Sequence, residues 1–203
     1  MNKLTKSVAG LMLALSAFSF SSCDDETDVI GLNDATKYGY IKLKFEGERP
    51  DGEDFESTKN FRFIPANDPL NNSYLDIGED GDLYYSFYAF RTFDAFDANG
   101  SNFANLQLNF STPDGESDFN YYNSYVNVTT FFTSKADHTA FYINTSLPLD
   151  EDAITSYSYN EKTGKLSLKF EVTLSGQENQ TGNELTVTGE IRTTVFTRLN
   201  YYD

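Results

Sequence analysis

The stretch Lys165-Leu-Ser-Leu-Lys-Phe-Glu-Val-Thr-Leu-Ser175 decides the fold class. Apolar and polar side chains alternate along it at nearly every step. The apolar set is Leu166, Leu168, Phe170, Val172 and Leu174, and the polar set is Ser167, Lys169, Glu171 and Thr173. In a β-strand successive side chains point to opposite faces of the sheet. The pattern therefore predicts a strand with one buried and one solvated face.

The segments beside this stretch extend it into a sheet. Residues 184–199 repeat the two-residue period, and Gly189 in their middle predicts a bulge or a close approach of another group. Before the stretch, residues 153–159 predict another strand. The connecting loop 160–164 ends at Gly164, which suits a left-handed backbone.

Further strands are predicted towards the N-terminus, over residues 38–47, 60–65, 83–91, 105–111, 124–133 and 139–145. Loops rich in Gly, Asn and Asp join them, and no helical period follows residue 22. About nine strands predict a single all-β domain over residues 38–203, an antiparallel β-sandwich. The long C-terminal strands would also fit a lipocalin-like up-and-down barrel around a small apolar ligand. Uneven strand spacing and the long loops of the first half favour the sandwich.

The N-terminus has the features of an export signal. Lys3 and Lys6 precede an apolar run over residues 8–20, which as a helix would reach only about 20 Å of the ~30 Å hydrocarbon core. A secretory signal peptide over residues 1–22 is therefore the expected reading.

The residues that follow resemble those of a known class. Phe20-Ser21-Ser22-Cys23 resembles a bacterial lipobox, although its usual first residue is Leu. This resemblance implies that Cys23 is lipidated, and more than one acyl chain gives a stable membrane anchor. The acidic residues Asp24, Asp25 and Glu26 resemble the export signal of Bacteroidota surface lipoproteins. Residues 23–37 would then form a tether, and the protein would be an outer-membrane lipoprotein displayed on the cell surface.

The charge of the chain limits its partners. The formal net charge is −16, and removal of Lys3 and Lys6 with the signal peptide makes it more negative. Nucleic-acid binding needs clustered Lys and Arg, so we expect no nucleic-acid partner. Docking of the domain itself onto anionic lipid is disfavoured for the same reason. Cys23 is the only cysteine, so no disulfide supports the fold.

Catalytic and metal-binding motifs are weak. Asp76, Asp80 and Asp82 lie in a Gly-rich stretch that could contribute to a calcium site, but two ligand positions of an EF-hand loop fail and a simple turn is favoured. His138 is the only histidine and is expected in an exposed turn. Paired carboxylates could run glycoside hydrolysis, yet any fold of so acidic a chain would place two close together. No cofactor is expected.

Aromatic side chains carry the remaining functional hypothesis. Tyrosines with neighbouring amides could stack on and hydrogen-bond to a sugar; the alternative is that they only pack the sheet. The candidates are Tyr84, Tyr88, Phe90, Tyr121, Tyr122 and Tyr125. We expect a non-enzymatic surface module that binds a glycan or an envelope protein. The alternatives are an assembly subunit of a surface complex or fimbria, in which exposed strands pair with a partner, and a hydrolase.

Overall fold

A computed structural model describes residues 38–64, 69–80, 82–94, 101–110, 124–133 and 140–199. The described residues all belong to one compact unit of the chain. In the described part, no helix is long and apolar enough to cross a membrane. Cys23, Asp24, Asp25, Glu26 and His138 lie outside the described residues.

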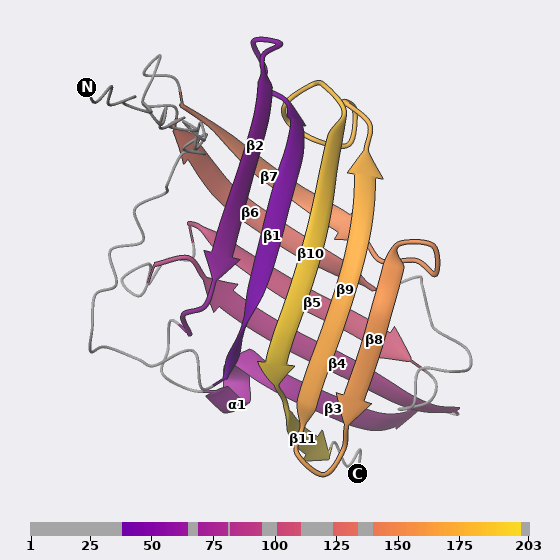
Figure 1. Ribbon diagram of the computed structural model, residues 1–203. Helices are drawn as coiled ribbons and strands as arrows, with labels where there is room; N and C mark the ends of the chain where they lie inside the picture. Colours follow the sequence, from indigo (N-terminus) through magenta and orange to yellow (C-terminus); the bar gives the residue numbers. More distant parts are fainter. Residues whose placement is uncertain are drawn as a thin grey trace, which may run out of the picture. The chain divides into compact units, whose positions relative to one another are not determined.

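Two sheets form the domain (Figure 1). The five-stranded sheet has the order β2 (Asp54–Phe61), β1 (Gly39–Glu48), β10 (Leu185–Thr194), β9 (Lys165–Leu174) and β8 (Ile154–Asn160). The six-stranded sheet has the order β11 (Phe196–Leu199), β3 (Ser73–Asp80), β4 (Asp82–Thr92), β5 (Phe103–Phe110), β6 (Tyr125–Thr133) and β7 (Ala140–Pro148). Neighbouring strands are antiparallel, except that β11 is parallel to β3. A short helix, α1 (Pro69–Asn72), precedes β3.

The predicted β-sandwich is confirmed, and the sheets do not close into a barrel. In Figure 1 the strands of the five-stranded sheet cross in front of those of the six-stranded sheet. The structure has eleven strands in its described part rather than about nine. One reason is that residues 73–80, which include much of the predicted Gly-rich turn, form strand β3. The other is that residues 184–199 contain two strands.

The core lies between the sheets and follows the predicted alternation. All five apolar residues of the 165–175 stretch are buried and belong to the core. Gly189 is a close approach and not a bulge, because the ladder with β9 is regular and the Phe170 ring covers the glycine. A Cβ at position 189 would lie 2.1 Å from that ring. Gly164 has the expected left-handed backbone, with φ of 67°.

The C-terminal strand changes sheets at Val195. Leu185–Thr194 pairs in the five-stranded sheet, whereas Phe196–Leu199 pairs with β3 in the six-stranded sheet. The Val195 amide donates to the Gly164 carbonyl, and the Thr194 amide donates to the Tyr38 carbonyl. Such strands make the corners where two sheets meet.

Arg91 is buried at the same corner and is 0% exposed. Its guanidinium donates to the carbonyl oxygens of Gly39 (3.3 Å), Asn72 (3.0 Å), Phe90 (2.7 Å) and Tyr38 (2.8 Å), and to Thr193 Oγ1 (2.7 Å). No carboxylate of the described residues pairs with it. Burial lowers the Arg91 pKa to about 10. The side chain therefore joins β4, the start of β1, the end of α1 and the end of β10.

Candidate functional site

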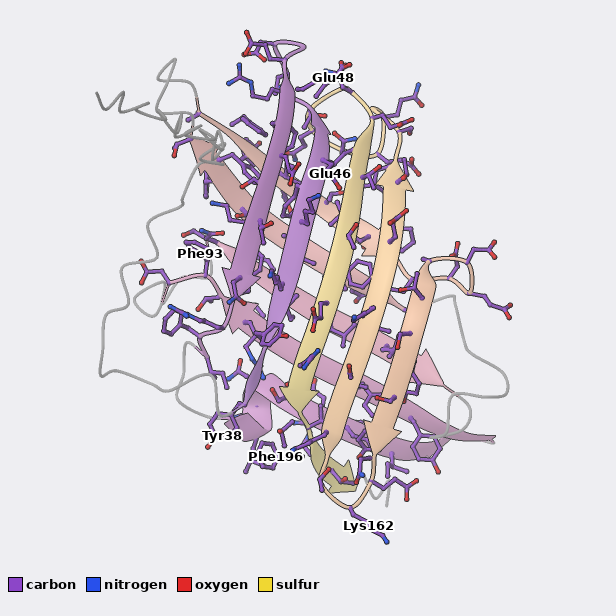
Figure 2. The ribbon with its side chains drawn as sticks, viewed as in Figure 1. Tyr38, Glu46, Glu48, Phe93, Lys162 and Phe196 are labelled. Carbon is purple, nitrogen blue, oxygen red and sulfur yellow. The ribbon has the colours of Figure 1, made fainter. Side chains whose placement is uncertain are left out.

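The outer face of the five-stranded sheet is charged. Lys42, Lys44 and Glu46 of β1 point outward beside Glu190 and Arg192 of β10, because their neighbours Ile41, Leu43 and Ile191 point into the core. Lys44 Nζ pairs with Glu46 (2.9 Å) and with Glu56 (3.1 Å), and Arg192 pairs with Glu190 (2.7 Å). Figure 2 views the molecule from this side. This face has the character of an ordinary solvated surface.

The outer face of the six-stranded sheet is different. Ala89, Leu106, Val128 and Ile143 point into the core, so register places the alternate residues of β4–β7 outward. We call these outward side chains the amide–aromatic face. Its described members are Ser86, Tyr88, Phe90, Phe103, Asn105, Gln107, Asn109, Tyr125, Asn127, Thr129, Phe131, Thr133, Ala140, Tyr142, Asn144, Ser146 and Pro148. None of these described members carries a charge, although the whole chain has 46 Asp, Glu, Lys and Arg side chains from its 31 acids and 15 bases.

Two aromatic pairs on this side of the sheet are stacked, so the rings of each pair cover one another. Tyr74 of β3 and Tyr88 stack at 4.8 Å with an interplanar angle of 21°, and Phe90 and Phe103 stack at 5.3 Å and 27°. These separations are close to the ~4.8 Å spacing of neighbouring strands, so each ring covers one face of its neighbour. Arg198 covers Tyr74 as well, with its guanidinium carbon 3.4 Å from the ring centroid.

The third pair, Phe131 and Tyr142, keeps ring surface in solvent. Their centroids lie 6.0 Å apart at 38°, and each residue is 50% exposed. They sit directly opposite each other on β6 and β7. In the described part, the only other large hydrophobic residue this exposed is Leu70. The Phe131–Tyr142 pair is therefore the main apolar surface that the described residues leave open.

Hydrogen bonds orient the amides of this face. The Tyr125 hydroxyl donates to Gln107 Oε1 (2.8 Å), Ser86 Oγ donates to Asn109 Oδ1 (2.5 Å), and Thr129 Oγ1 donates to Asn144 Oδ1 (3.0 Å). Each bond uses the amide oxygen as acceptor. The amide nitrogens of Gln107 and Asn144 have no acceptor among the described residues, so they remain donors for a ligand.

The tyrosine hydroxyls also influence one another. The pKa of Tyr88 is raised, mainly by burial of its side chain and further by Tyr74 and Tyr125. Tyr88 therefore stays protonated well above neutral pH and can donate a hydrogen bond. The face thus offers neutral donors and acceptors between aromatic rings.

Of the predicted sugar-binding residues, the structure brings Tyr88, Phe90 and Tyr125 onto one face. The backbone of Tyr84 pairs with Gly78, but its side chain is outside the described part, as are Tyr121 and Tyr122 altogether. Phe131 and Tyr142 were missed as site residues. The available signal is the alternation of residues 124–133, in which Phe131 falls on the face opposite the buried Val126 and Val128.

Of the predicted calcium ligands, the structure describes only the side chain of Asp76. Arg198 holds Asp76 by two contacts, Nε to Oδ1 (3.0 Å) and Nη2 to Oδ2 (3.2 Å). The side chains of Asp80 and Asp82 lie outside the described part. Among the described residues, no group of three or more His, Cys, Asp or Glu side chains could hold a metal ion.

A shallow acidic concavity of about 520 Å³ lies at one end of the five-stranded sheet. Its carboxylates are Glu46 and Glu48 (labelled in Figure 2), Asp54, Glu56 and Glu184. Lys44 pairs with two of them, and those hydrogen bonds raise the Lys44 pKa. This concavity lacks a feature that would select one ligand.

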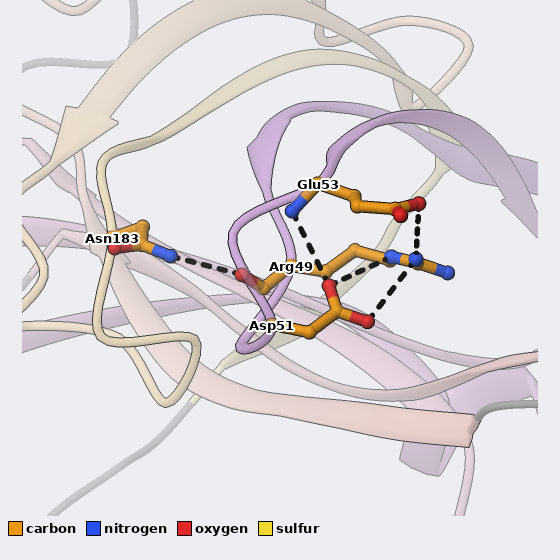
Figure 3. A network of polar contacts seen from close by, with 4 residues as sticks. All are labelled: Arg49, Asp51, Glu53 and Asn183. Atoms are coloured by element: carbon orange, nitrogen blue, oxygen red, sulfur yellow. Dashed lines mark hydrogen bonds and ion pairs between the residues drawn. The ribbon is translucent and has the colours of Figure 1, made fainter.

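Arg49 organises the adjacent β1–β2 turn (Figure 3). Its guanidinium contacts Asp51 (3.1 Å) and Glu53 (2.6 Å), and its carbonyl accepts from Asn183 Nδ2 (2.9 Å). The network ties this turn to the β9–β10 loop, so its role is structural.

The chain matches no family model, no curated protein and no solved structure. Function is therefore inferred from the chemistry of the site.

Proposed function

We propose that this protein is a non-enzymatic binding module of an outer-membrane lipoprotein, anchored through lipidated Cys23, displayed at the cell surface and binding a glycan through its amide–aromatic face. One observation supports a glycan as the ligand: the described members of that face carry no charge, although the chain is strongly acidic. Sugars present apolar C–H surfaces and many hydroxyl groups. Aromatic rings beside amide and hydroxyl groups complement both.

The same composition supports a binding role over a hydrolytic one. Glycoside hydrolysis generally uses a pair of carboxylic side chains on either side of the scissile bond. The described members of the face include no Asp, Glu or His. Among the described members of the face, a bound glycan would therefore meet groups that hold it and none that transfers a proton at the operating pH.

The proposal includes no resident metal. Asp76 is committed to Arg198, which argues against its service as a calcium ligand. Calcium with and without chelator is a sensible control, because a stabilising shift with calcium would revive the site proposed at Asp76, Asp80 and Asp82.

The melting temperature of the full chain in detergent tests glycan binding. A ligand that binds only the folded state at 100 times its dissociation constant stabilises by about 2.7 kcal/mol. For a domain of this size the melting temperature should then rise by about 5–10 °C. A panel of neutral and charged polysaccharides that produces no shift would contradict the proposal. Digestion by protease added to intact cells tests surface display separately.

Assembly through strand pairing is a second candidate, favoured by strand β8. This edge strand, Ile154–Asn160, contains no charged residue and no proline, and in the described part it pairs only with β9. Such an edge can accept a strand from a partner. A Ser158→Cys variant would test it, because disulfide or bifunctional cross-links to a partner would form only if this edge is in contact.

A further inference from the structure

We infer that the Phe131–Tyr142 pair, with Asn144 and Thr129, is the stacking subsite for an uncharged sugar ring. This inference rests on the proposed function and locates the ligand on one part of the amide–aromatic face. It also commits to a neutral glycan, in preference to an anionic or cationic one.

First, Phe131 and Tyr142 supply exposed aromatic ring surface for stacking. The rings of Tyr74, Tyr88, Phe90 and Phe103 pack face to face in pairs, so much of their π surface is already covered. Phe131 and Tyr142 are tilted by 38° and remain half exposed. A sugar that stacks its C–H face on this surface would replace water over an apolar area, which is favourable.

The second step is a hydrogen-bonding group beside the rings. Thr129 pairs with Asn144 one row along from the Phe131–Tyr142 row, which is two residues, or about 7 Å, along each strand. The Thr129 hydroxyl holds Asn144 Oδ1, and this bond orients the amide. Asn144 Nδ2 is then a donor without an acceptor in the described part. A sugar hydroxyl next to the stacked ring can accept from it.

The third step is the charge of the ligand. An anionic glycan requires Lys or Arg to offset its desolvation, and the described outward side chains of β4–β7 supply neither. The net charge of −16 would also repel it over long distances. A cationic glycan would be recognised by carboxylates, and the described outward side chains of β4–β7 supply none, while Asp76 on the neighbouring strand β3 is held by Arg198. A neutral sugar is the remaining match.

The test uses the full chain in detergent and affinity electrophoresis through gels that contain neutral polysaccharides (a glucan, a mannan, a galactan), a uronate polymer or a sulfated polymer. Phe131→Ala and Tyr142→Ala should each weaken retardation by the bound neutral polysaccharide about tenfold. Tyr142→Phe keeps the ring and should retain binding. Thr188→Ala, on the exposed outer side of β10, is the matched control and should bind as the wild type.

Each outcome decides one of the two proposals. Binding of a neutral polysaccharide that survives both alanine variants overturns the subsite while glycan binding stands. Retardation only by the uronate or sulfated polymer shows that the ligand is anionic, so the neutral-sugar subsite is wrong while glycan binding stands. No retardation by any polymer contradicts the proposed function as well. If the alanine variants instead abolish self-association or a protein cross-link, this patch is a protein interface and the inference is wrong. Unchanged melting temperatures show that the variants remain folded.

Discussion

Replacement of Arg91 by methionine should destabilise the domain by about 4 kcal/mol. Arg91 is fully buried, and its guanidinium makes five hydrogen bonds with distances of 2.7–3.3 Å. A hydrogen bond that involves a charged group contributes about 1.5–3 kcal/mol. At the lower value the five together contribute about 7.5 kcal/mol.

Burial of the charge opposes this gain. Burial lowers the Arg91 pKa from its ordinary value to about 10, which corresponds to a cost of about 3 kcal/mol for keeping the cation in the interior. Methionine removes this cost but leaves the carbonyl oxygens of Tyr38, Gly39 and Asn72 with fewer donors. The balance of about 4 kcal/mol is within the range for breaking a buried, hydrogen-bonded charge.

Urea unfolding of the full chain in detergent, followed by tyrosine fluorescence, measures this difference. Arg192→Met is the matched control, because Arg192 has a side chain that is 62% exposed and its loss should change the free energy of unfolding by less than about 0.5 kcal/mol. Arg91→Lys retains the charge with fewer donors and should fall between the two. An Arg91→Met variant as stable as the control would show that these hydrogen bonds give no net stabilisation, contrary to this prediction.

The remaining predictions concern packing, pH and anchoring. Gly189→Ala should lower the free energy of unfolding by about 1–2 kcal/mol in the same urea assay, because its Cβ must displace the Phe170 ring; no loss would show that the ring moves freely. The Glu190 pKa is lowered, chiefly by the Tyr40 hydrogen bond, so its stabilisation is present above the ordinary pKa of 4.5 and is lost as the pH falls through the lower folded value. Tyr40→Phe should therefore raise the Glu190 pKa in an NMR titration and flatten the loss of stability with acid; an unchanged pKa would contradict this cause. Cys23→Ser should release the protein from the membrane fraction, and retention there would exclude the lipid anchor.

The sequence predicted which face of most strands is buried, but it did not predict which sheet each strand joins. The alternation through residues 184–199 continues across Val195, where the chain changes sheets, because period two reports side-chain direction and carries no information on pairing partners. Arg91 lies at the end of a predicted strand, and an arginine at such a position is expected to be exposed to solvent. Its burial depends on carbonyls contributed by Tyr38, Asn72 and Phe90, which are brought together only by the folded corner.

The sequence also predicted only part of the candidate site, because alternation reports which way a side chain points and not how it packs. An aromatic strand predicts an aromatic sheet face, and Tyr88 and Tyr125 are on it. Tyr74–Tyr88 and Phe131–Tyr142 are both directly opposite pairs, so register alone does not decide whether a ring packs on its neighbour or keeps its surface in solvent. The tilt of the rings separates the stacked pair at 21° from the half-exposed pair at 38°, and the alternation of a sequence does not report that tilt.

The proposed ligand would cover the outer face of the six-stranded sheet. Hydroxyl-radical footprinting of the full chain, with and without the neutral polysaccharide that retards it most, tests this directly, because Tyr142 and Tyr40 lie on the outer faces of different sheets. We expect the ligand to protect Phe131 and Tyr142 from oxidation and to leave Tyr40 unchanged. Protection of Tyr40 with Tyr142 unchanged would contradict this expectation.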